Sequence, residues 1–338
     1  MGSTVNKRVV VIDTGYDSFD QEVEILGRSG YAVEPFPGDR HDAAGKAAFA
    51  RGADGMFVRW TPVDGPFLDA AATLKAIVRY GVGYDNIDLP AASARGIPVS
   101  NVQGYANHSV SDHALALILA CVRSLRRGME QLRPGYAAPP HPHVPELHEM
   151  TLGIIGLGRI GGTLCTKARG LFQRVLACDP YIPDDRFAAL GAEPQSLHAL
   201  LAASDVISLH CNLTQETRHL LNPHTLGRIR PNAIVINTAR GPVVDEDALT
   251  AALEAGQVFA AGIDVFEDEP PRSNRDPLLA HPRVVATGHY AWYSERASRE
   301  LQRRAALNLD AMLRGEIPED CLNGDAFRRS GTPKDGNA

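Results

Sequence analysis

Short apolar runs rich in β-branched residues alternate along the chain with Ala- and Leu-rich segments of helical periodicity. This alternation is typical of βαβ units with parallel sheets and helices on both faces. The runs are apolar throughout, as expected of strands that are buried on both faces. The nine predicted strands are Val9–Ile12, Gly55–Val58, Lys75–Arg79, Leu152–Ile155, Arg174–Ala177, Val206–His210, Ala233–Asn237, Phe259–Ile263 and Arg283–Ala286.

These strands fall into two groups, one on each side of a long helical pattern, so two sheets are expected. The pattern over Ser109–Arg127 predicts a single helix whose basic residues lie near its C-terminal end, where the helix dipole favours cations. A last long helix is expected over Ser294–Leu313. The polar tail from Asp325, and residues 331–338 above all, is expected to be disordered.

The segment Leu132–Pro145 contains five prolines and predicts a loop rather than regular structure. Its histidines His141 and His143 raise the alternative of a metal site, but the sequence offers no further set of ligands, so no metal is expected. A loop that contacts another subunit is the simpler interpretation.

Composition narrows the class of protein further. A chain of 338 residues suggests two domains and can bury a core without disulfides. The net charge of −6 argues against binding to nucleic acid. Five cysteines without a C-x-x-C pair indicate a reducing compartment. Because no apolar signal core or membrane-length apolar run is evident, we expect a cytoplasmic protein that does not bind membranes.

One predicted strand leads directly into a glycine-rich turn and a helix-like segment, Thr163–Leu171. In a G-x-G-x-x-G turn the first glycine permits a tight bend, the second lets a pyrophosphate approach, and the third lets the helix pack closely. The helix N-terminus then offers free N–H groups to the phosphates. The residues predicted to bind a dinucleotide here are Gly156, Gly158, Arg159, Ile160 and Gly161.

Asp179 follows the next predicted strand, 23 residues after Gly156. A carboxylate at this place accepts hydrogen bonds from the ribose hydroxyls and repels a 2′-phosphate. No arginine stands beside Pro180 and Tyr181 to receive such a phosphate. The expected cofactor is therefore NAD (NADH), with NADP disfavoured by Asp179. A turn or capping role for Asp179 is the alternative.

Charged side chains follow three further predicted strands. Arg240 comes after Ala233–Asn237, Asp264 and Glu269 come after Phe259–Ile263, and His289 comes after Arg283–Ala286. Ligands of open α/β sheets bind outside the carboxyl ends of the strands. We therefore expect these residues to converge beside the nicotinamide.

This set of side chains suits hydride transfer between a dinucleotide and a 2-oxo acid, in which the protein must orient the substrate and supply a proton. Arg240 can bind a carboxylate and polarise the neighbouring carbonyl. His289 can act as general acid and base, while Glu269 holds its other ring nitrogen. Asp264 is expected to bind the nicotinamide carboxamide. Taken singly, each residue also has a purely structural interpretation.

With these residues in place, the chain resembles the D-2-hydroxyacid dehydrogenase family over about Val9–Leu322. The motifs that carry the resemblance are VRYGVGYDNIDL, LGIIGLGRIGG, HCNLTQETRHLLN, NTARGPVVDEDAL and GIDVFEDEP. The segment AWYSERAS (Ala291–Ser298) is most similar to the C-terminal-binding-protein branch. The resemblance implies an α/β fold with two Rossmann-like domains and parallel sheets. Residues 1–103 and 294–330 would form a discontinuous substrate domain, residues 104–293 an inserted NAD-binding domain, and the protein a homodimer.

The resemblance also implies roles for individual residues. By position it makes Arg240, Glu269 and His289 catalytic, and it places Cys211, Thr238 and Asp264 near the cofactor. It places the substrate carboxylate on the loop containing Val82 and Gly83, with Arg79 and Trp292 lining the same pocket. Glu269 argues against formate as the substrate, because the formate dehydrogenase branch has glutamine there.

We therefore expect an NAD-dependent oxidoreductase for a small 2-oxo acid or D-2-hydroxy acid. One alternative is an NAD-sensing, peptide-binding scaffold of the C-terminal-binding-protein type, which would not need the three catalytic side chains. Another is a dehydrogenase of the same fold for a phosphonate or phosphite, with Arg59 supplying extra positive charge. The chain departs from the family at Gly288, where proline is usual, and at Tyr290, where alanine is usual.

Overall fold

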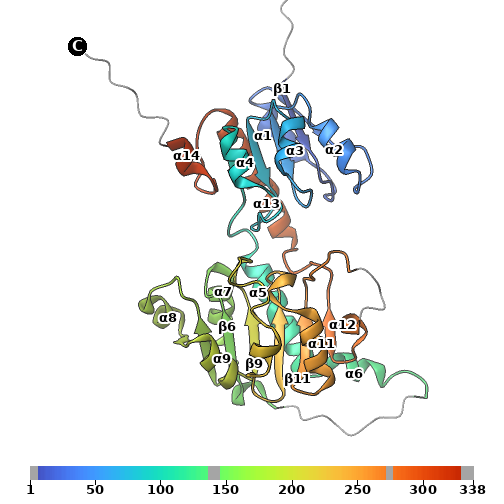
Figure 1. Ribbon diagram of the computed structural model, residues 1–338, viewed down its shortest axis with the longest axis vertical. Coiled ribbons are helices and arrows are strands. Elements are labelled where there is room, and N and C mark those ends of the chain that lie inside the picture. The colour runs from blue at the N-terminus through green and yellow to red at the C-terminus, as the bar shows by residue number, and fades with distance from the viewer. Residues whose placement is uncertain (1–6, 136–144, 272–276, 329–338) are drawn as a thin grey trace, which may run out of the picture. The chain divides into compact units, whose positions relative to one another are not determined.

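The computed structural model describes residues 7–135, 145–271 and 277–328, which form two α/β units (Figure 1). Unit 1 comprises Met1–Tyr105 and Glu295–Ala338, and unit 2 comprises Ala106–Ser294. The boundaries predicted after residues 103 and 293 fall within two residues of this division. Each unit has one parallel sheet, which confirms the predicted α/β class with two parallel sheets. The predicted disordered residues 331–338 lie outside the described ranges.

Unit 1 is built on a five-stranded parallel sheet of order β2-β1-β3-β4-β5. Its strands are β1 Lys7–Val11, β2 Tyr31–Pro35, β3 Gly55–Val58, β4 Ala76–Arg79 and β5 Val99–Ser100. Its helices are α1 Asp20–Gly27, α2 Ala43–Phe49, α3 Gly65–Ala70, α4 Leu89–Ala94, α13 Glu295–Leu313 and α14 Gly324–Arg328. The direction of winding reverses between β1 and β3, and such a point is where ligands bind in doubly wound sheets.

The long helix α13 completes the core of unit 1. It packs against α1, β3 and β4. The fit is tight enough that a Cβ built on Gly55 of β3 would lie 3.2 Å from side-chain carbons of both Leu309 and Leu313. The Ser29 hydroxyl also donates to Asp310 at 2.6 Å. Unit 1 therefore depends on residues that come from both ends of the chain.

Unit 2 is built on a seven-stranded parallel sheet of order β12-β11-β10-β9-β6-β7-β8. Its strands are β6 Thr151–Ile155, β7 Arg174–Cys178, β8 Glu193–Pro194, β9 Val206–Leu209, β10 Ala233–Asn237, β11 Val258–Ile263 and β12 Val284–Ala286. Its helices are α5 Asn107–Val122, α6 Leu125–Glu130, α7 Arg159–Ala168, α8 Asp184–Leu190, α9 Leu197–Ala203, α10 Pro223–Leu226, α11 Glu246–Glu254 and α12 Pro277–Ala280, with 3₁₀ turns at Leu147–Glu149 and Gly241–Val243. The winding reverses between β6 and β9.

Two buried clusters cover the two faces of this sheet. One includes Leu117 and Ile118 of α5 and Leu164 of α7, and the other includes Leu200 of α9 and Leu249 of α11. The strands between them are buried along almost their whole length. This explains why their sequences are apolar rather than alternating.

All nine predicted strands are present, but three were missed: β2, β5 and β8. Each lies at or beside the edge of its sheet, where one side lacks a partner strand. β2 mixes one buried residue with exposed ones, and β5 and β8 are two residues long. A short or half-exposed strand does not produce the apolar run on which the prediction relied.

Three predictions outside the strands need correction. The helix expected over Ser109–Arg127 ends at Val122, because Ser124 adopts a left-handed conformation with φ of 48° before α6 begins. The tail expected to be disordered from Asp325 begins with a short helix, α14. The prediction for α13 was one residue too long at its start.

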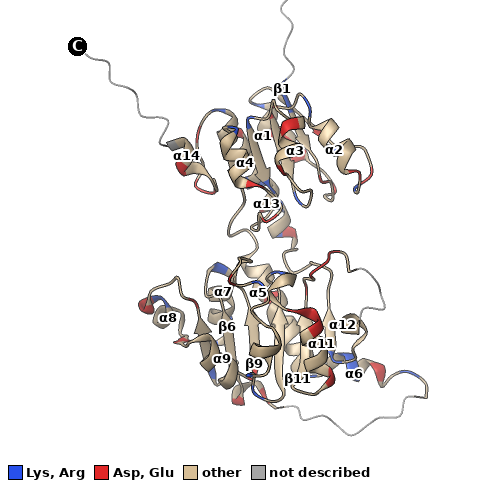
Figure 2. Ribbon diagram, in the orientation of Figure 1, with Lys and Arg blue, Asp and Glu red and all other residues tan. Residues whose placement is uncertain are grey.

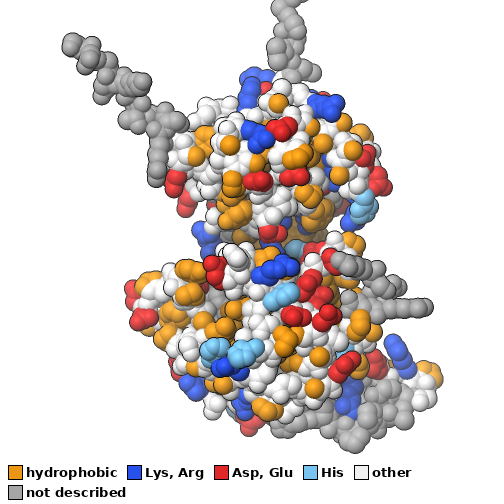
Figure 3. Space-filling model, viewed as in Figure 1, with side chains coloured by type: hydrophobic (Ala, Val, Ile, Leu, Met, Phe, Trp, Pro, Cys, Tyr) orange, Lys and Arg blue, Asp and Glu red, His pale blue; other side chains and the backbone are white. Residues whose placement is uncertain are grey.

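Charges are distributed without one dominant patch on the face shown in Figure 3, where acidic and basic side chains are interspersed. In Figure 2 the acidic residues of α11 stand out in unit 2, and basic residues lie on α6. No helix within the described ranges is both long and apolar enough to cross a bilayer. All five cysteines are free thiols.

Candidate active site

The glycine-rich turn after β6 lies where the winding of the unit 2 sheet reverses. Gly156 has φ of +88°, and a Cβ there would lie 2.6 Å from the backbone nitrogen of Cys211. At Gly161 a Cβ would lie 2.0 Å from the Gly156 carbonyl oxygen, so α7 packs directly on the turn. Gly158, in contrast, has no atom within 4 Å of the place its Cβ would occupy. The turn thus has one open position, which suits the approach of a phosphate group.

Asp179 follows β7 and is tied to this turn. Its carboxylate accepts hydrogen bonds from the backbone N–H groups of Leu157 at 2.8 Å and Tyr181 at 3.0 Å. The side chain is half-buried, so its oxygens remain accessible to a ligand. Asp179 therefore has both the turn role and the position expected for ribose binding.

Thr238 and Cys211 follow the neighbouring strands β10 and β9. Thr238 is 8% exposed, and its hydroxyl has no hydrogen-bond partner among the described residues. A buried hydroxyl without a partner is costly, so this atom is suited to a ligand. Burial raises the pKa of Cys211 to about 11, which makes it a neutral thiol rather than a nucleophile.

His210 is a feature of this site that the sequence analysis overlooked. It follows β9, and its Nε2 lies 2.8 Å from the Ser208 hydroxyl, while Nδ1 has no partner within the described ranges. Burial lowers the pKa of His210 to about 4, so the ring is neutral at pH 7. Its place directly after a strand, two residues from a serine, was the available indication.

Arg240 is positioned by a tight turn after β10. The buried Asn237 side chain donates to the Arg240 carbonyl at 2.9 Å and accepts from the Ala239 N–H at 3.0 Å. The guanidinium donates to the Ala239 carbonyl at 2.7 Å. A Cβ on Gly241 would overlap the Phe266 backbone, so the Arg240 turn lies against the segment that leads to Glu269.

Glu269 and His289 form a hydrogen-bonded pair after β11 and β12. Glu269 Oε2 lies 2.6 Å from His289 Nδ1, and Oε1 accepts from the Phe266 N–H at 3.1 Å. Burial acts to raise the pKa of Glu269, but its hydrogen bond to His289 and the nearby charges of His289 and Arg240 lower it overall. Because an ionised carboxylate only accepts, Nδ1 carries a proton and Nε2 is the nitrogen left for exchange.

Asp264 holds the loop that carries His289. Its carbonyl accepts from the His289 N–H at 2.6 Å. Its carboxylate accepts from the Thr287 hydroxyl at 2.5 Å and from the N–H groups of Tyr290 at 2.8 Å and Ala291 at 2.9 Å. The residue is 1% exposed. The structure thus gives Asp264 a loop-holding role, which the sequence analysis missed when it expected only a contact with the cofactor.

Aromatic residues follow the histidine. Trp292 is half-buried, and its carbonyl accepts from the Ser109 hydroxyl of α5 at 3.0 Å. Tyr290 is 54% exposed and its ring lies 5.4 Å from that of Tyr293. Tyr290, which replaces the usual alanine, thus projects from the loop that carries His289.

Three predicted substrate residues belong to unit 1. Arg79 ends β4 and donates from Nη1 to the Tyr80 carbonyl at 2.8 Å. Gly81 has φ of +130°, and its Cβ would overlap the Arg79 guanidinium. The Val82 carbonyl accepts from the Asn101 side chain at 2.6 Å, which holds the loop through Gly83 in place.

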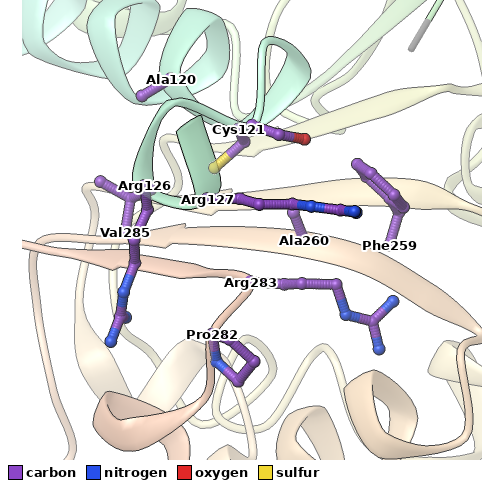
Figure 4. Close-up of a pocket in the computed structure, with 10 residues that line it drawn as sticks. Ala120, Cys121, Arg126, Arg127, Phe259, Ala260, Pro282, Arg283 and Val285 are labelled. Atoms are coloured by element: carbon purple, nitrogen blue, oxygen red, sulfur yellow. The ribbon is translucent and has the colours of Figure 1, made fainter. Parts of the chain in front are cut away.

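A pocket elsewhere in unit 2 does not belong to this site (Figure 4). It lies at the amino ends of β11 and β12, opposite the ends that carry Asp264 and His289. Arg126, which lines it, donates to the carbonyls of His281 at 3.1 Å and Val284 at 2.6 Å. The Arg126 guanidinium therefore stabilises the fold through these hydrogen bonds.

No cluster of three or more potential metal ligands occurs in the described ranges. His141 and His143, the alternative raised by the sequence, lie outside those ranges.

Comparison with known proteins identifies the family. Residues 115–291, slightly more than half of the chain, match the NAD binding domain of the D-isomer specific 2-hydroxyacid dehydrogenases. A glyoxylate reductase of Korarchaeum cryptofilum is 38% identical over 79% of this chain and 81% of its own length. The chain belongs to the D-isomer specific 2-hydroxyacid dehydrogenase family, and it is an enzyme of that family.

Other relatives by sequence are longer. A D-3-phosphoglycerate dehydrogenase of Methanocaldococcus jannaschii is 37% identical over 80% of this chain, but the match spans only 52% of that protein. The same share, 52%, holds for the enzyme of that name from Mycobacterium leprae. The chain thus spans about half the length of these two relatives.

Solved structures agree with the fold. The TT0316 protein of Thermus thermophilus is 34% identical, with a TM-score of 0.83 over 93% of this chain and 99% of that one. The Aquifex aeolicus D-lactate dehydrogenase, solved with NAD and lactic acid, is 27% identical, with a TM-score of 0.82 over 94% and 99%. An acyclic imino acid reductase, Bsp5, solved with NADPH and D-Arg, is 25% identical, with a TM-score of 0.82 over 93% and 99%. These named relatives are not of the C-terminal-binding-protein branch, so the assignment to that branch is not supported.

Proposed function

We propose that this enzyme interconverts a small 2-oxo acid and its D-2-hydroxy acid with NAD(H), using His289 as general acid and base. The observation that carries the proposal is the 2.6 Å contact between His289 Nδ1 and Glu269 Oε2 in the unit that matches the NAD-binding domain. This contact supports a proton at Nδ1 and leaves Nε2 to exchange a proton with the substrate oxygen.

The proton chemistry follows from the pair. In the reducing direction, protonated His289 donates from Nε2 to the oxygen that becomes the hydroxyl, and Glu269 stabilises the imidazolium before transfer. In the oxidising direction neutral His289 accepts the same proton. Arg240 binds the carboxylate next to the reacting carbonyl and orients it. Bound NAD(H) supplies or accepts the hydride.

The residues of unit 2 fit a dinucleotide. Gly158 leaves open the space that a Cβ would fill, and the buried Thr238 hydroxyl lacks a partner in the part of the chain that the structure describes. We propose that Gly156, Gly158 and Gly161, with the N–H groups at Arg159 and Ile160, bind the pyrophosphate. Asp179 binds the ribose, and Thr238 with Cys211 and Asp264 borders the nicotinamide half. Because Asp179 would repel a 2′-phosphate, we propose NAD rather than NADP, although the relative Bsp5 was solved with NADPH.

The substrate carboxylate is proposed to bind the N–H groups of the loop containing Val82 and Gly83, which Asn101 holds in place. Arg79 and Trp292 complete the set of substrate-binding residues. Glyoxylate and lactic acid are named for two of the relatives, so glyoxylate and pyruvate, the 2-oxo acid that corresponds to lactate, are the first substrates to test.

The test is NADH oxidation with a panel of glyoxylate, pyruvate, hydroxypyruvate and phosphonopyruvate. Replacing His289 by alanine should lower kcat about 10²–10⁴-fold while NADH binding, followed by fluorescence, is retained. Glu269→Gln should lower kcat less, because the ring keeps a hydrogen-bond partner but loses the charge. Normal turnover by H289A on the best substrate would refute the assignment.

A second candidate substrate carries an additional anionic group such as a phosphonate. The observation that favours this substrate is a group of arginine and aromatic side chains near the carboxyl ends of β3 and β4 in unit 1. The Arg59 guanidinium lies 4.1 Å from the Trp60 ring centroid and 5.5 Å from that of Tyr16, and Arg79 is near enough to influence Tyr16 electrostatically. If this cluster binds a second anion, Arg59→Leu should raise KM for phosphonopyruvate and leave KM for pyruvate unchanged.

The alternative of a peptide-binding scaffold without turnover is not favoured, because the chain belongs to an enzyme family and the relatives named above are enzymes.

We also propose that the enzyme is a homodimer, as the family resemblance implies. Three apolar side chains on α6 or just after it are exposed to solvent. Leu125 is 52% exposed, Met129 is 72% exposed and Leu132 is 85% exposed. Leu125 and Met129 are four residues apart on α6 and so lie on one side of that helix, and Leu132 follows just after its end. A second copy would cover them. Light scattering should show a dimer, and Leu125→Lys with Met129→Lys should yield a monomer.

A further inference from the structure

The loop from Thr287 to Trp292 places His289 in an uncommon conformation. His289 has φ of +52°, in the left-handed region that non-glycine residues seldom occupy. Such a conformation persists only where surrounding contacts determine it. Gly288, just before it, gives the loop no side chain with which to restrain itself. The contacts that hold this loop are therefore important for where the imidazole lies.

Helix α5 contacts both ends of the loop. At the first end, His113 Nε2 lies 2.9 Å from the Thr287 hydroxyl. At the other end, the Ser109 hydroxyl donates to the Trp292 carbonyl at 3.0 Å. Residues 109 and 113 are four apart and so lie on one face of the helix. That helix is firmly placed, because Ala114, Leu117 and neighbouring side chains are buried in the unit 2 core.

The hydrogen bonds between His113 and the loop have a defined direction. The Thr287 hydroxyl has one proton, and at 2.5 Å from Asp264 Oδ1 it donates that proton to the carboxylate. Thr287 can then only accept from His113, so Nε2 of His113 carries a hydrogen. A continuous chain thus runs from His113 through Thr287 to Asp264. Asp264 in turn accepts from the backbone N–H groups of His289, Tyr290 and Ala291.

We propose that His113 and Thr287 are positioning residues for His289, acting through Asp264, and that Ser109 secures the other end of the same loop. The inference rests on the proposed function of His289 as the proton donor. A loop released at one end would still fold and still bind cofactor and substrate, but it would present the imidazole less often in the reactive position. Misplacement of a reacting group by about 1 Å can cost 10²-fold in rate.

The experiment compares kcat, KM and the NADH dissociation constant in the full-length enzyme with the best 2-oxo acid of the panel. Thr287→Val keeps the shape and removes the hydroxyl, and should lower kcat roughly 10- to 100-fold with little change in KM or NADH affinity. Thr287→Ser keeps the hydroxyl and should retain most of the wild-type kcat. His113→Leu should lower kcat in the same sense, and Leu119→Ala, at a partly exposed position of the same helix, should not.

Combining the two variants tests the hydrogen-bond network that links His113, Thr287 and Asp264. His113 Nε2 also lies 3.6 Å from Asp264 Oδ1, so His113 and Thr287 act on the same carboxylate. The loss of kcat in the double variant should therefore be smaller than the product of the two single losses, whereas independent roles would multiply them. Unchanged kcat in Thr287→Val, equal impairment in Thr287→Ser, or multiplicative losses would each overturn the inference. If Thr287→Val does not fold, Thr287→Ser and His113→Leu decide the matter by the same criteria.

His289→Ala separates this inference from the proposed function. If His289→Ala were inactive and Thr287→Val fully active, the positioning role of His113 and Thr287 would be refuted, but the proposed function would stand. An active His289→Ala would refute the proposed function whatever the other variants do.

Discussion

Two glycines of the turn after β6 differ in what a methyl group would meet. At Gly158 a Cβ has no atom within 4 Å, so Gly158→Ala should leave the free energy of unfolding of the free protein nearly unchanged. The same methyl group would occupy the space proposed for the pyrophosphate, so NADH affinity should fall at least 10-fold, which is about 1.4 kcal/mol. Fluorescence titration with NADH and urea unfolding measure the two effects.

Gly161→Ala is the matched comparison. Its Cβ would lie 2.0 Å from the Gly156 carbonyl oxygen, so the helix must shift and stability should fall together with NADH binding. If Gly158→Ala destabilised the free protein as much as Gly161→Ala, the open position assigned to Gly158 would be wrong.

His210 predicts a pH dependence of stability. Its pKa is lowered by burial from 6.5 to about 4 in the folded protein. Between these values the unfolded chain binds a proton that the folded protein does not, so stability should fall as the pH drops from 6.5 to about 4. Because the side chain is only half-buried, we expect this contribution to be about 2 kcal/mol. Below pH 4 both states are protonated and the contribution stops changing.

The measurement is urea unfolding between pH 4 and pH 7, with His210→Gln as the control that cannot titrate. The wild type should lose more stability than the variant over this interval. Parallel stability curves for the two proteins would contradict the burial of a neutral His210.

Individual residues also show how far the sequence could predict the site. Arg240, Glu269 and His289 could be named because each follows a strand, and parallel strands bring their carboxyl ends to one edge. The role of Asp264 could not be named, because its partners are the N–H groups of a loop whose path depends on the fold. His113 is 174 residues from Thr287 and gave no local indication.

At the scale of elements, a buried ion pair joins the segment after β1 to helix α2. Lys46 Nζ lies 2.7 Å from Asp13 Oδ1, with side chains only 6% and 2% exposed. Asp13 also accepts from the N–H groups of Arg59, Trp60 and Thr61 at 2.8–2.9 Å. Burial acts to raise the pKa of Asp13, but these hydrogen bonds lower it overall.

Asp13→Ala should therefore destabilise the protein by about 3–5 kcal/mol, because it leaves a buried lysine without its counterion. The double variant Asp13→Leu with Lys46→Met should recover part of this loss, since no charge remains. It should not restore the loop at residues 59–61, whose N–H groups still lack an acceptor. Urea unfolding gives the energies, and equal losses in the single and double variants would show that the ion pair is not the cause.

The elements that could be predicted are those buried on both sides. Nine strands were evident because their residues face helices above and below, whereas β2, β5 and β8 lie at or beside sheet edges and share no uniform apolar pattern. The break after Val122 could not be foreseen, because Ser124 and its neighbours have ordinary helical propensities and none of them marks the left-handed conformation that Ser124 adopts.

At the scale of the whole molecule, the contiguous unit 2 should be separable. A fragment of residues 106–294 contains the whole seven-stranded sheet, both buried clusters and every proposed dinucleotide-binding residue. We expect it to fold alone and to bind NADH with an affinity comparable to that of the full chain, but to have no turnover. Calorimetric unfolding and NADH titration test this, with Gly158→Ala in the fragment as the control. A fragment that fails to bind would place part of the dinucleotide site in unit 1.

The origin of α13 at the far end of the chain has a consequence for biosynthesis. The first 105 residues leave the ribosome well before Glu295–Leu313, the helix that covers β3 and β4. At roughly 5–20 residues per second, the intervening 189 residues take on the order of 10–40 s to translate. During this interval α13 is not yet present to cover one face of the N-terminal strands. Unit 2, which is made next, can fold as soon as it emerges. The part of the enzyme that is synthesised first is therefore the part that matures last, and it is where newly made chains most need protection by a chaperone.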